Sequence, residues 1–332
     1  MGVEMLCPHF VTARRLSYVL AMVALSACST SEYAGPIKTF SDATDSATAS
    51  MKKLNESLAE ATLNYAVAAA ARDPQNNSLV VDGCGAFIPG QETRCTATFE
   101  MKASLSPPTT MTLERELYTD PLGGMVAIMV ALQDYAKNLA ALQSDNTVAE
   151  VNESIDNVQA SLVELVKAAG GDEPPGDLPK AAGELVKWAF GQYIESVKYR
   201  ALRDATRAAT KPLRLAAVAF KPIDESVKAV LTVPVQADAA ESLKNMNEED
   251  ESSIRRTLAV QNAYDDLLTA PMSQMFDDLV AAHEDLASSL DGTTPLSVRG
   301  ALAKLKEVQK QAVTLAKIAT DLKAALKKPP SS

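Results

Sequence analysis

The sequence predicts an all-α protein, built as an elongated antiparallel multi-helix bundle with seams like those of coiled coils. Apolar residues recur every three or four positions over long stretches, and this spacing keeps one side of a helix against a neighbour. Alanine is abundant, only 5% of the 332 residues are aromatic, and glycine and proline gather in a few places. This composition is typical of helix-rich proteins.

Four stretches carry the repeat most clearly. The first ends at Arg72-Asp73-Pro74, because proline cannot continue a helix. The last is the longest and follows Thr294-Pro295. The four seams are Phe40, Ala47, Met51, Leu54, Leu58, Ala61, Tyr65 and Ala68; Met125, Ile128, Leu132, Tyr135, Leu139 and Leu142; Val148, Val151, Ile155, Val158, Leu162 and Leu165; and Val298, Ala301, Leu305, Val308, Ala312, Leu315, Ala319, Leu322 and Leu326.

A helical hairpin is predicted over residues 123–169. Only the short segment 143–146 separates its two seams, so the two helices have to lie antiparallel as neighbours. Ser144 or Asp145 is expected to cap the start of the second helix, since both are favoured N-cap residues.

The second half of the chain contains the strongest interruption, the segment GGDEPPGDLP at 170–179. It marks either a boundary between two subdomains or a loop of one bundle. A long helix is predicted from Leu178 to Ala209. Proline is comfortable in the first turn of a helix, so the prolines that follow are expected to start separate short helices. These prolines are Pro212, Pro222 and Pro234.

Two further helices are predicted before the last one. The first begins before Ile254 and is kinked or split by Pro271, and the second stops at Asp291-Gly292.

The N-terminal segment has a short apolar run, Leu16–Leu25, preceded by Arg14-Arg15 and followed by Ser26-Ala27-Cys28. A helix that spans a membrane needs ~20 apolar residues, so this run is too short. A basic start, a short apolar middle and small residues at the end are typical of a secretory signal peptide.

Leu25-Ser26-Ala27-Cys28 resembles the lipobox of bacterial lipoproteins, and the resemblance covers residues 14–28. It implies cleavage before Cys28, a diacylglyceryl group on the Cys28 sulfur, and acylation (for example with palmitate) of the new amino terminus. A single acyl chain gives only marginal membrane binding, which accounts for several chains. By family analogy, Ser29 favours the periplasmic face of the outer membrane. An ordinary cleaved signal peptide is the alternative.

These features divide the chain into a signal peptide (1–27), a lipidated tether (28–38), a helical bundle (39–328) and a disordered tail (329–332). Removing residues 1–27 leaves 30 basic and 41 acidic residues, a net charge of 30 − 41 = −11. This charge argues against a nucleic-acid partner, which requires clustered positive charge. It also argues against adhesion to anionic lipid by bulk charge, so the acyl chains have to supply the membrane attachment.

Two cysteines remain after Cys28, and an even pair in an oxidising compartment predicts a Cys84–Cys95 disulfide. A loop of this length stabilises a fold by roughly 2–3 kcal/mol. A two-cysteine metal site lacks further ligands, because His283, the one histidine beyond Cys28, is distant in sequence. The segment 79–101 has glycines and β-prone runs, which indicates a small hairpin or ordered loop stapled by this disulfide.

Two surfaces are candidates for contact with a partner: the stapled loop and the basic last helix. Ordered loops on rigid scaffolds often carry function, although the disulfide could simply stiffen a connector. The lysines of the last helix could dock an acidic partner or could balance the helix dipole. The candidate contact residues are Phe87, Ile88 and Arg94 in the loop and Lys306, Lys310 and Lys317 on the helix.

No catalytic motif is present, so we expect no enzyme, no cofactor and no metal site. His283 lies near several carboxylates in sequence, but such a residue is more often solvated or capping than a metal ligand. The sequence therefore predicts a non-enzymatic, membrane-anchored envelope lipoprotein that serves as a scaffold or docking module for an envelope protein or polymer. The alternative is a binder of lipid or another apolar ligand, with packing gaps from Trp188 to Phe220.

Overall fold

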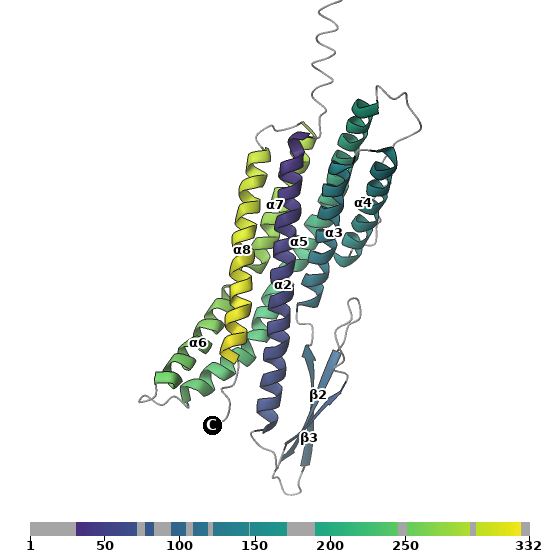
Figure 1. The fold of residues 1–332 in the computed structure, drawn as a ribbon. Coiled ribbons are helices and arrows are strands. Elements are labelled where there is room, and N and C mark those ends of the chain that lie inside the picture. The colour runs from purple at the N-terminus through teal and green to yellow at the C-terminus, as the bar shows by residue number, and fades with distance from the viewer. Residues whose placement is uncertain are drawn as a thin grey trace, which may run out of the picture.

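The protein forms an elongated helical bundle with a small antiparallel sheet, as the computed structural model shows (Figure 1). The structure describes residues 31–71, 77–82, 94–103, 109–118, 122–145, 147–170, 190–244, 251–292 and 297–326. The elements are α2 (Ser31–Ala71), β1 (Asn77–Asp82), β2 (Arg94–Ala103), β3 (Thr109–Tyr118), α3 (Gly123–Ser144), α4 (Val148–Ala168), α5 (Phe190–Lys244), α6 (Glu251–Leu268), α7 (Met272–Leu290) and α8 (Ser297–Leu326). The predicted all-α bundle is confirmed.

Helix α2 runs the length of the bundle and packs against α3, α7 and α8 (Figure 1). Its 41 residues give it a length of about 60 Å. The predicted seam is its buried face: Phe40, Met51 and Leu58 are all at most 1% exposed. The apolar repeat therefore identified which side of this helix meets its neighbours.

The expected tether 28–38 is wrong for residues 31–38, because α2 already begins at Ser31. Gly35-Pro36 suggested a break, and Pro36 does lack the N–H that a helix would use. Ile37 is nonetheless buried, and the Tyr33 hydroxyl donates to the Ser289 carbonyl at 3.1 Å. These contacts outweigh the cost of one proline close to the helix start.

The predicted helical hairpin is confirmed as α3 and α4, but neither Ser144 nor Asp145 caps the second helix. Thr147 does: its hydroxyl accepts from the Glu150 N–H at 3.2 Å, and the Glu150 carboxylate accepts from the Thr147 N–H at 3.0 Å. Thr-x-x-Glu is the sequence signature of this reciprocal arrangement. Ser144 instead donates to the Ala141 carbonyl at 2.9 Å and belongs to the end of α3.

Helix α5 is continuous over 55 residues and passes through Pro212, Pro222 and Pro234, so the prediction of separate short helices is wrong. A proline inside a helix costs ~3 kcal/mol. Tertiary packing opposes that cost, since Leu213 and Phe220 are buried and Phe220 stacks on Phe276 with ring centroids 4.6 Å apart. If the helix broke at each proline, the buried face that contains Leu213 and Phe220 would lose its contact with the core.

The remaining helix boundaries follow the prediction. Helix α6 ends at Leu268, and α7 starts directly after Pro271. Helix α7 ends at Leu290, and Gly292 then adopts a φ of +70°, the left-handed conformation that favours glycine after a helix.

The three strands form an antiparallel sheet in the order β1-β2-β3, beside the C-terminal part of α2 (Figure 1). Strands β1 and β2 are the hairpin predicted within 79–101, with Val80 opposite Thr98. Strand β3 was not predicted, and Leu113 lies opposite Phe99. Its signal in the sequence is the alternation of Met111, Leu113 and Leu117 with polar residues, which Arg115 interrupts.

The N-terminal ends of α3 and α7 are capped by side chains from other helices. The residues at their own N-cap positions, Leu122 and Pro271, provide no side-chain cap. Instead Asn55 of α2 accepts from the Leu122 N–H at 2.8 Å. Asp224 of α5 accepts from the Ser273 N–H at 3.2 Å and from its hydroxyl at 2.6 Å. Each acceptor satisfies an N–H that has no partner inside its own helix.

Lysines of α5 provide donors for carbonyls at the C-terminal ends of α3 and α6. Lys228 donates to the Ala270 carbonyl at 2.7 Å, just after α6, and Lys198 donates to the Asp145 carbonyl at 2.7 Å, just after α3. Asp224 and Lys228 are four residues apart on α5. Lys228 therefore donates at the end of α6, and Asp224 accepts at the start of α7.

Removing an acceptor that caps a neighbouring helix is expected to destabilise the bundle. We predict that Asn55→Ala and Asp224→Ala each lower the free energy of unfolding by about 1 kcal/mol, because an N–H at a helix start loses its partner. Urea unfolding followed by circular dichroism measures this change. Asp42→Ala, which removes only the exposed pair with Lys38, is the control. Equal effects of Asp42→Ala and Asp224→Ala would contradict the assignment.

Candidate functional site

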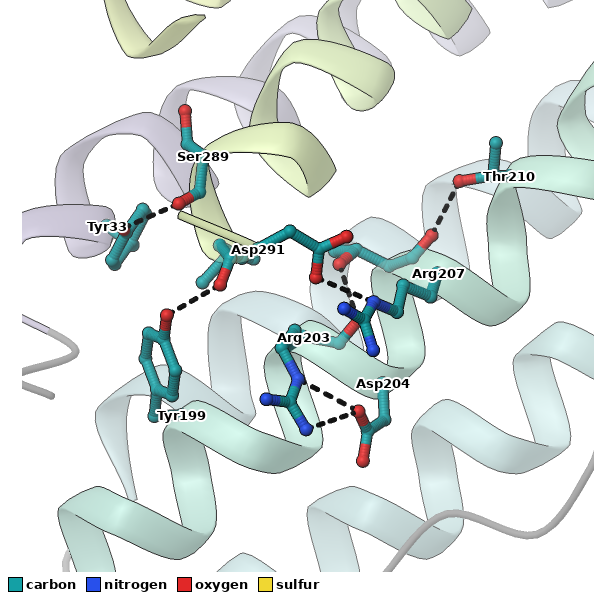
Figure 2. A network of polar contacts seen from close by, with 10 residues as sticks. Tyr33, Tyr199, Arg203, Asp204, Arg207, Thr210, Ser289 and Asp291 are labelled. Carbon is teal, nitrogen blue, oxygen red and sulfur yellow. Dashed lines mark hydrogen bonds and ion pairs between the residues drawn. The ribbon is translucent and has the colours of Figure 1, made fainter. Parts of the chain in front are cut away.

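Polar contacts concentrate at the end of the bundle where α2 begins, in a group that we call the terminal cluster: Tyr33, Tyr199, Arg207, Ser289, Leu290 and Asp291 (Figure 2). Tyr33 of α2 and Tyr199 of α5 donate to the carbonyls of Ser289 and Leu290, at 3.1 and 2.5 Å. Their ring centroids are 6.2 Å apart. The Leu290 carbonyl thereby gains a partner that a helix end lacks, and the Ser289 carbonyl, which also accepts from the Gly292 N–H at 3.0 Å, gains a second one.

An ion pair lies at the same end of the bundle. Arg207 Nε lies 2.6 Å from Asp291 Oδ1, and this hydrogen bond raises the pKa of the Arg207 guanidinium. Arg207 is 54% exposed, so the ion pair adds little stability. Burial, followed by the nearby Tyr199, raises the pKa of Tyr33, which keeps its hydroxyl protonated as a donor. The terminal cluster therefore fastens the first turn of α2 to α5 and α7.

The second polar group lies inside the core. His283 of α7 is fully buried, so the expectation of a solvated or capping residue is wrong. Its Nε2 lies 3.0 Å from the Tyr135 hydroxyl, which also lies 3.4 Å from the Ala205 carbonyl. The His283 ring centroid is 5.8 Å from that of Phe40 and 5.7 Å from that of Tyr135. His283 is part of the apolar stripe of α7, with Phe276 and Leu279.

Burial keeps both members of this pair neutral. It lowers the pKa of His283 to about 3 and raises the pKa of Tyr135 well above its usual value. Among the described residues, Nδ1 of His283 has no hydrogen-bond partner. An unpaired buried N–H costs more than an unpaired lone pair, so we assign the proton to Nε2, which donates to Tyr135 while Tyr135 donates to Ala205. These two hydrogen bonds have a structural role, since they connect α3 to α5 and to α7.

The lysines predicted for a docking surface are exposed on α8, but two of them already have acidic partners on their own helix. Lys310 lies 2.8 Å from Glu307, and Lys317 pairs with Asp321. Lys306 is exposed as well. Because of these pairs, the basic character of this face is weaker than the lysine count alone indicates.

The other predicted site residues are described only in part or not at all. The backbones of Arg94 and Cys95 belong to β2. Cys28, Cys84, Phe87, Ile88, Trp188 and the tail 329–332 lie outside the described residues. Lipidation of Cys28 and the Cys84–Cys95 disulfide therefore stay predictions.

Three surface clefts open between neighbouring helices, and none of them had been predicted. One of about 580 Å³ lies between α2 and α3, and one of about 660 Å³ lies between α3 and α4. The third, also about 580 Å³, lies between α6 and α8 and carries charged residues at both ends. Neither His283 nor Tyr135 lines any of these three clefts. A sequence pattern does not show clefts of this kind, because they depend on how far apart two helices pack.

Within the described residues, no cluster of three or more histidine, cysteine or carboxylate side chains could hold a metal ion. Over the same part of the chain, none of the helices combines the length and hydrophobicity of a transmembrane segment.

Comparisons of the chain with protein families, with curated proteins and with solved structures give no match.

The buried histidine predicts a specific loss of stability in acid. An unfolded histidine has a pKa near 6.5, so between that pH and about 3 the unfolded chain binds a proton that folded His283 does not. The free energy of unfolding should therefore fall as the pH decreases through this range, by up to ~1.4 kcal/mol per pH unit.

Urea unfolding from pH 7 to pH 5 measures this term when the protein is compared with His283→Gln. Glutamine keeps an amide donor near Tyr135 but does not titrate, whereas all carboxylates are common to both proteins. We expect a steeper pH dependence for the unsubstituted protein. Parallel curves for the two proteins would contradict the assignment of His283 as a neutral buried group.

Proposed function

We propose that this chain is a non-enzymatic lipoprotein of the bacterial envelope, held by acyl chains on Cys28 at the periplasmic face of the outer membrane. In this proposal the bundle is a rigid spacer that presents its sheet to an envelope protein or polymer. The observation that carries the proposal is the continuity of α2, which runs from three positions after Cys28 to the vicinity of the sheet (Figure 1).

The dimensions of α2 support a spacer. The three residues from Cys28 to Ser31 can span at most about 10 Å, so the start of α2 would lie next to the lipid headgroups. The sheet would lie toward the other end of a helix about 60 Å long. Contacts of the terminal cluster prevent the first turn of α2 from acting as a hinge, so distance from the membrane would be set by the fold.

The loop between β1 and β2 is the proposed contact, through Phe87 and Ile88 together with Arg94 at the start of β2. Two paired strands fix the ends of this loop, and a Cys84–Cys95 disulfide would restrict it further. Lys306 of α8 is a weaker candidate, because its neighbours Lys310 and Lys317 are already paired with acidic residues.

The apolar-ligand alternative depended on short proline-started helices that would leave packing gaps before Phe220. Continuous α5 removes that argument for the described part of the segment, where Leu213 and Phe220 are buried in the common core.

Mass spectrometry of the protein extracted from the membrane fraction tests the anchor. We expect a chain that begins at Cys28 and carries both a diacylglyceryl group and an amide-linked acyl chain. Cys28→Ala should move the protein to the soluble fraction. An unmodified Cys28 in membrane-bound protein would contradict the anchor.

Site-specific photo-crosslinking in living cells tests the docking role. A photoreactive amino acid in place of Phe87 or Ile88 is expected to capture an envelope protein or polymer in a discrete product. The same substitution at Val218, an apolar residue of α5 that is 73% exposed, is the control and should capture none. Equal capture at all three positions, or none at any, would contradict the proposal.

A further inference from the structure

The cleft between α6 and α8 has the features of a ligand site. Its volume of about 580 Å³ is in the range of small-molecule sites. Four alanines line it: Ala259 and Ala263 on α6 and Ala324 and Ala325 on α8. Their small side chains leave the groove between the two helices open.

One end of this cleft carries a cation, the guanidinium of Arg256. Arg256 lines the cleft, and its Nε is buried without a hydrogen-bond acceptor among the described residues. A guanidinium that lines a cleft favours a carboxylate, because the hydrogen bonds between these two charged, planar groups are short and strong.

The opposite end carries an excess of negative charge. Asp265, Asp266 and Asp321 lie there with only Lys317, which gives a local charge of −2 from the four side chains. Lys317 pairs with Asp321, and Asp265 accepts from Gln261 at 3.3 Å. Lys317 also interacts electrostatically with Asp266, although no hydrogen bond or ion pair to the Asp266 carboxylate is found in the described part of the chain. This end therefore favours an ammonium group.

The separation of the two ends sets the size of a ligand that reaches both. Arg256 and Asp266 are ten residues apart on α6, which corresponds to about 15 Å along the helix axis. An extended peptide spans ~3.3–3.6 Å per residue, so about four residues cover this distance.

We propose that the α6–α8 cleft binds a short extended peptide with free ends, its carboxylate at Arg256 and its ammonium at Asp266. The two charged ends orient the peptide along the groove, and the alanine floor leaves room for its side chains. This site lies on α6 and α8 and is independent of the loop and anchor in the proposed function.

Calorimetric titration of the full-length protein in detergent with tetra-alanine tests this site. Tetra-alanine should bind, whereas the same peptide with an acetylated amino end or an amidated carboxyl end should bind roughly tenfold more weakly, because each loses one charged contact. Arg256→Gln should weaken binding of free tetra-alanine but have little further effect on the amidated peptide. Asp266→Asn should behave correspondingly with the acetylated peptide.

Arg255→Gln is the matched control, since Arg255 is adjacent in sequence, 76% exposed and paired with Glu251 outside the cleft. It should leave the affinity unchanged. Absence of tetra-alanine binding, or binding that does not respond to Arg256→Gln and Asp266→Asn, would overturn the proposal. The end-blocked peptides test the unsubstituted protein, so the result does not depend on the variants folding.

Discussion

The arrangement of this bundle depends on one requirement: a helix that ends inside a packed structure has to find partners for its terminal N–H and C=O groups. Here the two longest helices provide many of those partners. Asn55 of α2 and Asp224 of α5 accept from the N-terminal ends of α3 and α7, and Lys198, Lys228 and Tyr199 of α5 donate at C-terminal ends. Because each contact joins a side chain to one backbone atom, it fixes the register of two helices as well as their separation.

The same need to pair buried polar groups would keep the bundle rigid, as the proposed spacer role requires. Apolar seams alone allow helices to slide by a turn, whereas a polar group in the wrong register would be buried without a partner. The pair of Tyr135 and His283 adds a fixed point at the centre of the core. At the end where α2 begins, Tyr33 and Tyr199 remove the freedom that Gly35 and Pro36 would otherwise give.

The sequence predicted the helices and their buried faces well, because an apolar repeat is a local pattern that the core simply satisfies. It predicted polar details poorly, since these depend on residues distant in the chain. Asn55 gives no sign in the sequence that it caps a helix that starts near Leu122, and His283 looked solvent-exposed because of its charged neighbours. Pro212 did not start a separate helix, because burial of the adjacent face of α5 outweighed the cost of a proline inside it. Strand β3 was different, since its alternation was visible.

The most direct test of this account is hydrogen exchange at two backbone amides, those of Leu122 and Ser273, measured by NMR. Leu122 directly precedes α3, and Ser273 lies in the first turn of α7. The N-cap residues of these helices offer no side-chain acceptor, so protection of the two amides from exchange has to come from Asn55 and Asp224. We expect slow exchange at both amides, and Asn55→Ala should accelerate exchange at Leu122 while leaving Ser273 unchanged. Exchange at the rate of an unstructured peptide at both sites in the folded protein would contradict the central role of capping between helices.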